Sequence, residues 1–241
     1  MIVIPMAGLS RRFFDAGYDR PKYMLPIGED TAFDRSIASF QAYFTDRPFL
    51  FIARETGGVA DFIDARTEAL GIAETRVVML DRETAGQAET VELGIDAAGV
   101  AADSPLTIFN IDTFRPGYRE PDAARLASIA GWLEVFRGSG DNWSYVRPSD
   151  EAARIAAETA EKKPISDLCC TGLYHFSRAD DFRTALAAER AAPQAKELYV
   201  APLYNHLMAR GLTVGYEIIA PEEVIFCGTP AEYHAVLAND A

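Results

Sequence analysis

The chain begins Met1-Ile-Val-Ile-Pro-Met-Ala-Gly-Leu-Ser-Arg-Arg-Phe-Phe-Asp-Ala-Gly-Tyr-Asp-Arg-Pro-Lys22, and the other segments are best understood from this one. Ile2 to Ile4 form a short β-branched run, which is typical of a buried strand in a parallel sheet. The small residues after Pro5 predict a loop whose backbone N–H groups lie at the carboxyl edge of that sheet, where such groups bind phosphate. Arg12 and Lys22 would bring two cations to the same place. An ordinary polar loop is the alternative, and the glycine spacing fits neither a dinucleotide-binding Rossmann loop nor a P-loop.

Composition limits the kind of protein. The 241 residues are 49% apolar and 24% charged, which suits one α/β domain with a substantial core. The formal charge of −13 argues against binding to nucleic acid or to an anionic membrane. An anionic substrate would therefore need a local cluster of cations.

Cysteine use and hydropathy predict a cytoplasmic protein. Cys169, Cys170 and Cys227 are odd in number and lack the spacing of a zinc site, so we expect small buried residues in a reducing compartment. The first apolar run has no Lys or Arg before it and stops at Gly8, unlike a signal peptide. No run approaches the roughly 18 apolar residues needed to span a bilayer. The sequence leaves the oligomeric state open.

Apolar periodicity predicts alternating strands and helices in the first half of the chain. The expected strands are 2–4, 49–53, 77–80 and 106–111, and the expected helices are 33–44, 59–70 and 87–98. This alternation predicts an α/β fold with a mainly parallel sheet and helices on both faces. Ligands of such sheets bind beyond the carboxyl ends of the strands, where Lys22, Gly86 and Asp112 would converge.

The second half changes character. Short strands are expected at 132–136, 143–146, 153–156 and 168–176, helices at 180–190 and 199–210, and extended segments at 214–219 and 224–226. The short strands predict a small antiparallel addition around the pocket of a second substrate. Thr229-Pro-Ala-Glu232 predicts the start of the last helix, with Thr as the cap and Glu completing a capping box.

Three short segments carry residues suited to chemistry. Asp112 ends an apolar strand, where a carboxylate suits Mg²⁺; a helix cap or a loop ion pair is the alternative. Gly86 allows a close backbone approach and Gln87 can pair two ways with a base edge, unless they only begin a helix. Glu161-Lys-Lys-Pro164 offers two cations, although such a lysine pair is usually just solvated.

Taken together, these segments resemble a known family. Met6-Ala-Gly-Leu-Ser-Arg-Arg-Phe13, followed by Pro21-Lys22, is similar to the A-G-x-G-[ST]-R-[FM] … P-K signature of the sugar-nucleotide pyrophosphorylases and related nucleotidyltransferases. Ser10 stands where the second glycine is usual, and serine is less free at positive φ. Leu9-Ser10 inside the loop most resembles the branch for capsule and surface-polysaccharide biosynthesis, which includes cytidylyltransferases.

The resemblance implies a fold and a reaction. The fold would be the three-layer, Rossmann-like nucleotide-diphospho-sugar transferase fold, as a single domain over 1–241 with a nucleotide-binding half at 1–115 and an acceptor-binding half at 116–241. The reaction would be Mg²⁺-dependent transfer of a nucleotide monophosphate from an NTP, with CTP favoured, to a small phosphorylated acceptor with release of pyrophosphate. A hexose phosphate and a phosphorylated amino acid or aminoalcohol are both open as acceptors.

The resemblance also implies a role for each matching residue. Arg12 would neutralise the departing pyrophosphate, Lys22 the α-phosphate and Lys162 the attacking phosphate. Asp112, in the family's N-x-D form, would hold the metal. The expected nucleotide-binding residues are Met6, Ala7, Gly8, Leu9, Ser10, Gly86, Gln87 and Asn110. The expected acceptor-binding residues are Glu161, Lys163, Gly172 and Glu197. Because Lys163 precedes Pro164 as in the family's E-K-P form, the choice between Lys162 and Lys163 stays open.

One departure leaves alternatives. Family members often have a second metal aspartate just before a late G-T-P, whereas Phe226-Cys227 precede Gly228-Thr-Pro230 here; Glu222 or Glu223 could substitute. A metal-dependent glycosyltransferase of the same fold would usually carry D-x-D and would leave Arg12 and Lys22 unexplained. A nucleotide-binding regulator that has lost a metal ligand is the non-enzymatic alternative.

Overall fold

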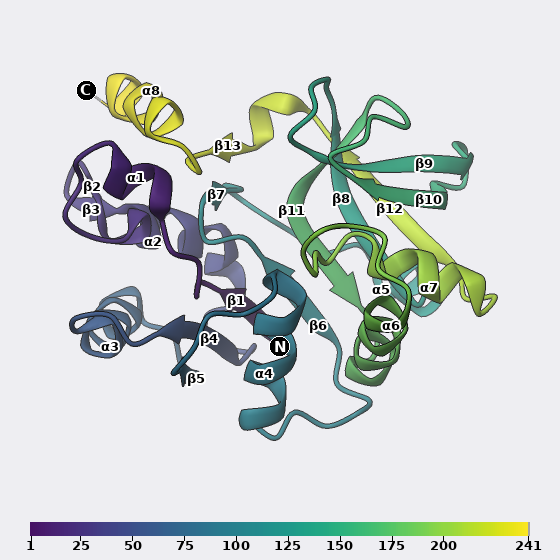
Figure 1. Cartoon of the computed structure of the whole chain (residues 1–241), viewed down its shortest axis with the longest axis horizontal. Helices are drawn as coiled ribbons and strands as arrows, with labels where there is room; N and C mark the ends of the chain where they lie inside the picture. The colour runs from purple at the N-terminus through teal and green to yellow at the C-terminus, as the bar shows by residue number, and fades with distance from the viewer. Residues whose placement is uncertain (241) are drawn as a thin grey trace.

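One sheet of nine strands runs through residues 1–240, which the computed structural model describes, in the order β5-β4-β1-β6-β11-β8-β12-β10-β9 (Figure 1). Its first four members are parallel to one another: β5 (Thr75–Leu80), β4 (Phe49–Arg54), β1 (Ile2–Pro5) and β6 (Leu106–Phe109). The predicted parallel sheet is therefore confirmed. Strand β6 ends at Phe109, earlier than expected, where its neighbour β11 becomes irregular at Gly172; the Asn110 N–H still donates to the Gly172 carbonyl at 3.1 Å.

Helices cover both faces of this parallel part. They are α2 (Ala32–Ile37), α3 (Val59–Leu70) and α4 (Gln87–Ala97). Because side chains alternate along a strand, Ile4 and Phe51 pack in one core with α2 and α3, whereas Val3 and Leu50 pack in another with α4. Thr31 caps α2 through a capping box with Asp34, and the expected helix over 33–44 continues past α2 as the 3₁₀ segment η2 (Ala38–Tyr43).

The second half extends the same sheet. Its strands are β8 (Gly131–Arg137), β9 (Ser144–Asp150), β10 (Ile155–Glu161), β11 (Leu168–Phe176) and β12 (Val214–Ile219). Strand β11 is antiparallel to both β6 and β8 and so joins the two halves, while β9 and β10 form an antiparallel pair. Strand β12 runs parallel to β8, so the addition is mixed rather than purely antiparallel. The chain between them, through β11 and two helices, supplies the long crossover that a parallel pair requires.

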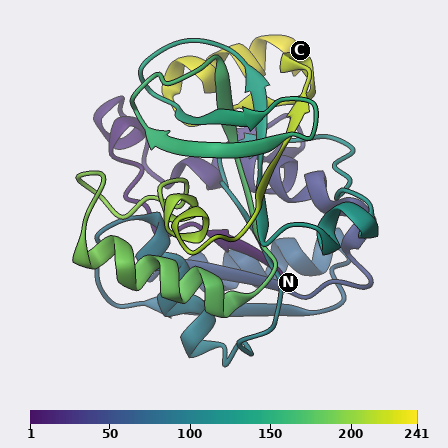
Figure 2. The same ribbon diagram turned by 90° about the vertical axis from the view of Figure 1, so that its right-hand side faces the viewer.

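The strands of the second half curl so that β9, at the edge of the sheet, also pairs with β11. Tyr145 of β9 pairs with Cys169 of β11, although β9 is also the last strand of the sheet. In Figure 2 these teal-to-green strands lie above the green helix α6 (Ala179–Ala191). Helix α7 (Leu203–Ala209) starts after Pro202, later than expected, and the short α5 (Ala123–Ala127) precedes β8.

The C-terminal segment returns to the N-terminal one. After the 3₁₀ turn η3 (Pro221–Glu223), β13 (Ile225–Phe226) pairs with β7 (Thr113–Phe114), directly after Asp112. Helix α8 (Pro230–Asp240) begins with the predicted capping box, because the Thr229 hydroxyl accepts from the Glu232 N–H at 3.2 Å. Figure 1 shows α8 (yellow) near α1 (Arg11–Asp15, purple), and Tyr233 shares a core with Phe13.

The short elements after α1 complete the N-terminal segment. They are η1 (Lys22–Met24), β2 (Pro26–Ile27) and β3 (Asp30–Thr31). Within residues 1–240, no helix has both the length and the apolar character to cross a membrane.

Candidate active site

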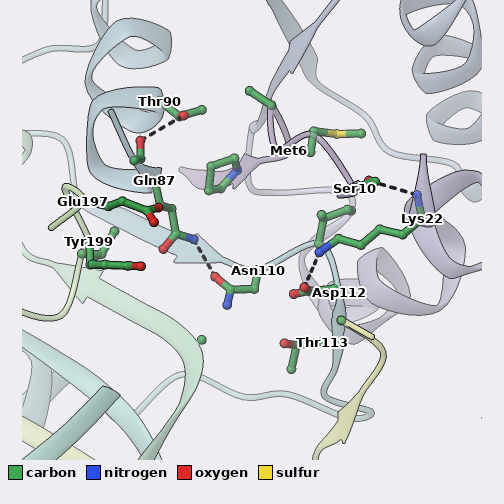
Figure 3. A pocket seen from close by; sticks show the side chains of 18 of the residues that line it. Met6, Ser10, Lys22, Gln87, Thr90, Asn110, Asp112, Thr113, Glu197 and Tyr199 are labelled. Atoms are coloured by element: carbon green, nitrogen blue, oxygen red, sulfur yellow. Dashed lines mark hydrogen bonds and ion pairs between the residues drawn. The ribbon is translucent and has the colours of Figure 1, made fainter. Parts of the chain in front are cut away.

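A cavity of about 950 Å³ opens beyond the carboxyl ends of β1 and β6 and reaches across to β9 and β10. Figure 3 shows Lys22 and Asp112 on one side of it and Glu197 and Tyr199 on the other. Its size is that of a pocket for a small-molecule ligand. Every residue predicted for the site lines this cavity except Lys163, which is exposed outside it: Met6, Ala7, Gly8, Leu9, Ser10, Arg12, Lys22, Gly86, Gln87, Asn110, Asp112, Glu161, Lys162, Gly172 and Glu197.

In the loop after β1, Ser10 adopts the positive φ that a glycine at this position would adopt easily. Ser10 has φ 50° and ψ 28°, in the left-handed region that favours glycine. Its hydroxyl accepts a hydrogen bond from the N–H of Lys22 at 3.2 Å, a contact that glycine could not make. Ser10 thus ties the loop to the segment that carries Lys22. A side chain at Gly8 would meet no atom within 4 Å, so the loop backbone faces open space in the cavity.

Lys22 and Asp112 form an ion pair in the cavity. Lys22 Nζ lies 2.5 Å from Asp112 Oδ2, and each side chain is 23% exposed. Burial acts to raise the pKa of Asp112, but the nearby Lys22 ammonium, helped by Arg12, outweighs it and holds that pKa below its usual value. Within residues 1–240, the Arg12 guanidinium has no hydrogen bond or ion pair of its own, so this cation is available to an anionic ligand.

The loop before α4 is fixed by the second half of the chain. Gly86 has φ 153°, and a Cβ there would lie 2.5 Å from the Leu198 carbonyl oxygen. The Leu198 N–H donates to Ala85 O at 2.9 Å, and the Ala88 N–H donates to Leu198 O at 2.8 Å. Gly86 therefore permits a close backbone approach, as expected, but the approach seen is that of Leu198.

Gln87 and Asn110 hold each other at the floor of the cavity (Figure 3). Gln87 Nε2 donates to Asn110 Oδ1 at 2.5 Å, which orients both amides. Gly172 has φ 95°, and a Cβ there would lie 2.4 Å from Asn110 Nδ2. The pairing of β11 with β8 is irregular between Cys170 and Tyr174, so Gly172 sits at a β-bulge and also makes room for Asn110.

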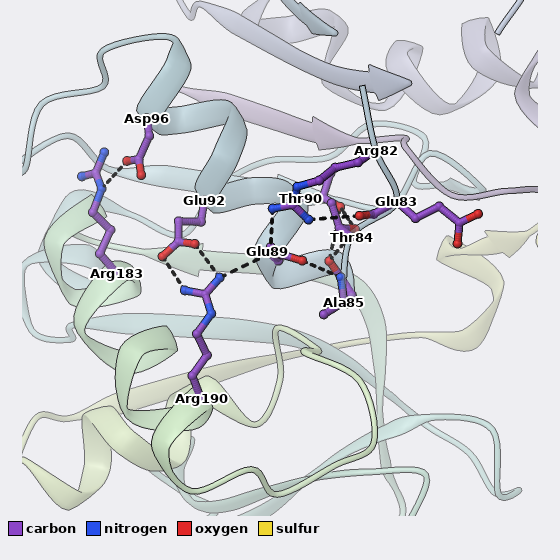
Figure 4. Close-up of polar contacts among 11 residues, drawn as sticks. Arg82, Glu83, Thr84, Ala85, Glu89, Thr90, Glu92, Asp96, Arg183 and Arg190 are labelled. Atoms are coloured by element: carbon purple, nitrogen blue, oxygen red, sulfur yellow. Dashed lines mark hydrogen bonds and ion pairs between the residues drawn. The ribbon is translucent and has the colours of Figure 1, made fainter. Parts of the chain in front are cut away.

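Glu89 and Arg190 brace the same loop from behind (Figure 4). The Ala85 N–H donates to the Glu89 carboxylate at 2.5 Å, and Arg82 Nη2 donates to the other oxygen of Glu89 at 3.1 Å. Arg190 of α6 pairs with Glu92 of α4 at 2.6 Å. The two helices, one from each half of the chain, are thereby joined next to the loop that precedes Gln87.

Lys162 faces the first half from the end of β10. It has φ 53°, and its Nζ donates to the Tyr199 hydroxyl at 2.7 Å and lies 4.7 Å from the centre of that ring. The hydrogen bond to Tyr199 raises the pKa of Lys162, with smaller help from Glu161 and Glu197, so Lys162 is charged at neutral pH. Burial raises the pKa of Glu161, whose carboxylate also accepts from Ser144.

The cavity also contains aromatic residues beside Lys162 that were not predicted from the sequence. The Lys162 N–H donates to the Trp143 carbonyl at 2.8 Å, which places Trp143 across the β9–β10 hairpin from Lys162. The ring of Phe226 lies 4.6 Å from that of Trp143, and both rings line the cavity. Tyr199 and Lys196, which also line the cavity, lie in the segment that carries Glu197. Trp143 and Phe226 are distant in the chain, so tertiary packing and not local sequence brings their rings together.

Asp112 suits a divalent cation. Its Oδ2 already pairs with one cation, the Lys22 ammonium. A Cβ at Gly228 would lie 2.8 Å from Asp112 Oδ2, so only glycine leaves that space open. Residues 1–240 contain no cluster of three or more His, Cys, Asp or Glu arranged to hold a metal. A hard cation here would take its other ligands from phosphates and water, as Mg²⁺ commonly does.

Glu222 and Glu223, the candidates for a second metal ligand, do not reach Asp112. Glu223 pairs with Arg115 at 3.2 Å, and neither Glu222 nor Glu223 lines the cavity. Glu232 lines it, but its Oε2 accepts hydrogen bonds from the N–H groups of Gly228 and Thr229, both at 2.9 Å. The position before Cys227 is taken by the Phe226 ring.

Solved structures of low sequence identity share this fold. The fold matches that of nucleotidyltransferases, including the inositol-1-phosphate CTP transferase from T. maritima (14% identity, TM-score 0.72, covering 99% of this chain and 94% of that one). The UTP-bound UGPase from Acinetobacter baumannii matches it as well (17% identity, TM-score 0.68, covering 99% and 92%). At these identities the likeness shows the fold alone. No family model and no curated protein matches the sequence.

A more similar structure shows the family. The nucleoside-diphosphate-sugar pyrophosphorylase from Vibrio cholerae RC9 is 49% identical, with a TM-score of 0.94, over 99% of this chain and 100% of that one. The chain belongs to the nucleoside-diphosphate-sugar pyrophosphorylase family and is an enzyme of the nucleotidyltransferase type.

Proposed function

We propose that this enzyme transfers CMP from CTP to a small phosphorylated acceptor, with Mg²⁺ and with release of pyrophosphate, to make a precursor of a surface or capsular polysaccharide. One observation carries the proposal: Arg12, Lys22 and Asp112 lie at one side of a single cavity and Lys162 lies at the other. Two anionic substrates could thus be held with their phosphates facing each other. CTP is favoured by the Leu9-Ser10 loop, which resembles the capsule branch.

The cavity suits an in-line displacement at the α-phosphorus. An oxygen of the acceptor phosphate forms the new bond to the α-phosphorus, and the bond to the bridging oxygen of the leaving pyrophosphate breaks. The attacking oxygen is already anionic, so no general base is required. Catalysis then rests on positioning and on neutralising charge. Lys162 would hold the attacking phosphate, Lys22 the α-phosphate and Arg12 the pyrophosphate. Mg²⁺ held by Asp112 would neutralise charge on the nucleotide phosphates.

The other lining residues are assigned by their place. The backbone of Met6 to Ser10 would follow the phosphates, because Gly8 leaves that backbone accessible. Gln87 and Asn110, held together, would contact the base, with Gly86 shaping the loop beside them. Glu161, Gly172 and Glu197 would line the acceptor end. Lys162 is preferred over Lys163 because Lys163 lies outside the cavity. The two halves would act as one domain, since a single sheet passes through both.

A pyrophosphate-release assay tests this function. The enzyme is offered each of the common NTPs with hexose phosphates and with phosphorylated aminoalcohols, with and without Mg²⁺. We expect release that needs an NTP, an acceptor and Mg²⁺ together, and that is fastest with CTP. Release with UTP or dTTP but not with CTP would show that CTP is the wrong choice of nucleotide. Transfer only from a nucleotide-sugar would indicate a glycosyltransferase, and nucleotide binding without release would indicate a regulator.

A further inference from the structure

We propose that Lys22 is a stand-in cation that keeps Asp112 closed to divalent metal until a nucleotide arrives. The inference rests on the metal role proposed for Asp112 and the phosphate role proposed for Lys22. Its structural basis is the 2.5 Å ion pair between Lys22 Nζ and Asp112 Oδ2. Within residues 1–240, Lys22 is the one side chain that is hydrogen-bonded to the Asp112 carboxylate.

The pair is held in register by the surrounding backbone. The Lys22 N–H donates to Ser10 Oγ at 3.2 Å, and the Cys227 N–H donates to Asp112 O at 2.8 Å. Both side chains are mostly shielded from water, so the attraction between them is screened less than that of a surface pair. The ammonium therefore lies on the carboxylate that is proposed to hold the metal.

A metal ion alone would meet two costs at this site. The metal would have to compete with the Lys22 ammonium for the Asp112 carboxylate. The ammonium, once displaced, would stay close to the divalent cation and repel it. Glu232 offers little compensation, because its Oε2 is already engaged by the N–H groups of Gly228 and Thr229. Arg12 adds further positive charge near Asp112. The free enzyme should therefore bind divalent cations weakly.

A nucleotide removes both costs. Its phosphates give Lys22 another anion to pair with, and they supply ligands that a metal at Asp112 lacks. Lys22 and the metal then exchange places on Asp112 without an unpaired charge. Metal and nucleotide should accordingly bind cooperatively, each raising the affinity for the other by the same factor.

Mn²⁺ titration of the free enzyme, followed by electron paramagnetic resonance, tests the idea without any chemistry. Lys22→Met should bind Mn²⁺ at least roughly tenfold more tightly than wild type in the absence of nucleotide, within the usual range of coupling between sites. Lys22→Gln should give the same direction of change and covers the case in which Lys22→Met does not fold. Lys196→Met removes another lysine that lines the cavity but does not touch Asp112, so its Mn²⁺ affinity should stay near that of wild type. The double variant Lys22→Met/Asp112→Asn should lose the gain.

Three results would overturn the inference. Tight Mn²⁺ binding by the wild-type enzyme without nucleotide would show that Lys22 does not block the site. An unchanged affinity in both Lys22 variants would mean that no displacement is needed. A gain that survives Asp112→Asn, or that appears equally in Lys196→Met, would place the effect elsewhere or make it a general effect of charge. An enzyme that fails every pyrophosphate-release assay yet shows the gain refutes the proposed function and leaves this inference standing.

Discussion

The two sides of the cavity hold their cations in different ways. On the side of β1 and β6, Lys22 is paired with a carboxylate at 2.5 Å. On the side of β9 and β10, Lys162 rests on the neutral Tyr199, and its nearest carboxylate, Glu161, is 3.8 Å away. Lys22 must break an ion pair to bind a phosphate, whereas Lys162 gives up a neutral partner. On the first side a phosphate would compete with a carboxylate for the cation, and on the second side it would compete with a hydroxyl group.

Asp112→Asn should have the largest effect, because it removes the carboxylate that pairs with Lys22 and is proposed to hold the metal. We expect kcat to fall by roughly 10³-fold or more, the upper range for loss of a preorganised charged group. The fold should persist, since Asp112 lies at the edge of a cavity. Pyrophosphate release and thermal unfolding measured together check both points. Turnover like that of wild type, with the same Mg²⁺ dependence, would remove Asp112 from the metal site.

Arg12→Ala should come next. Arg12 has no competing partner within residues 1–240, so its whole charge is available to an anionic ligand. If that ligand is the departing pyrophosphate, as proposed, loss of Arg12 should lower kcat by roughly 10²-fold. Arg11→Ala is the matched control: Arg11 is 73% exposed and lies 3.5 Å from Glu83. Steady-state kinetics should show a much smaller change there. If Arg12→Ala alters only the acceptor KM, the cation serves the other side of the cavity.

Lys162→Ala should separate the two sides. Loss of one ion pair to the acceptor phosphate should cost about 2 kcal/mol, roughly thirtyfold in kcat/KM for the acceptor. Binding of the NTP alone, measured by calorimetry, should hardly change, because the proposed nucleotide contacts come from residues 6–112.

Lys163→Ala is the control for register in that experiment. It lies outside the cavity and should behave like wild type. Damage in Lys163→Ala with none in Lys162→Ala would reverse the assignment. No effect in either would mean that the acceptor phosphate is bound elsewhere.

The smallest expected effect is on stability, and it comes from the pairing of β6 with β11, where the two halves of the chain meet. His175 of β11 is buried beside Thr107 of β6, with its Nδ1 3.1 Å from the Thr107 hydroxyl, and burial lowers its pKa to about 4. Between that value and the ordinary pKa near 6.5, the unfolded chain binds a proton that the folded chain does not. His175 should therefore lower the free energy of unfolding by about 1–2 kcal/mol from pH 7 to pH 5.

Denaturant unfolding at the two pH values measures this loss. His175→Gln cannot take up the proton, so its stability should fall less over the same range. An equal loss in wild type and His175→Gln would assign the pH dependence to other groups.

The first side of the cavity could be predicted from sequence because its groups lie in short contiguous motifs at strand ends. The run 2–4 predicted β1, and the loop after it carries Arg12 and Lys22; Asp112 follows β6 in the same way. Parallel strands end at one edge, so such residues converge without knowledge of distant contacts. Their chemical roles remain predictions. The strand expected at 143–146 runs further, as Ser144–Asp150, and the one expected at 153–156 lies later, as Ile155–Glu161, because these two strands pair with each other and local apolar pattern does not fix the length of that hairpin.

The second side depends on contacts that local pattern does not encode. Trp143 lies opposite Lys162 because β9 pairs with β10, and the ring of Phe226, from the distant β13, packs against the ring of Trp143. The bonds that fix Gly86 come from Leu198, more than a hundred residues later in the chain. No spacing rule in 84–90 could reveal that partner. The parallel pairing of β12 with β8 escaped prediction for the same reason.

The backbone bonds of Leu198 have a consequence for any attempt to divide the enzyme. A polypeptide that stops at residue 115 would lack the carbonyl and N–H that join Ala85 and Ala88, and it would expose the edge of β6 that β11 normally covers. Such an uncovered edge favours aggregation. The two pieces should recover activity only when they are refolded in each other's presence, so this protein suits fragment complementation at that point and does not suit use of its N-terminal piece alone.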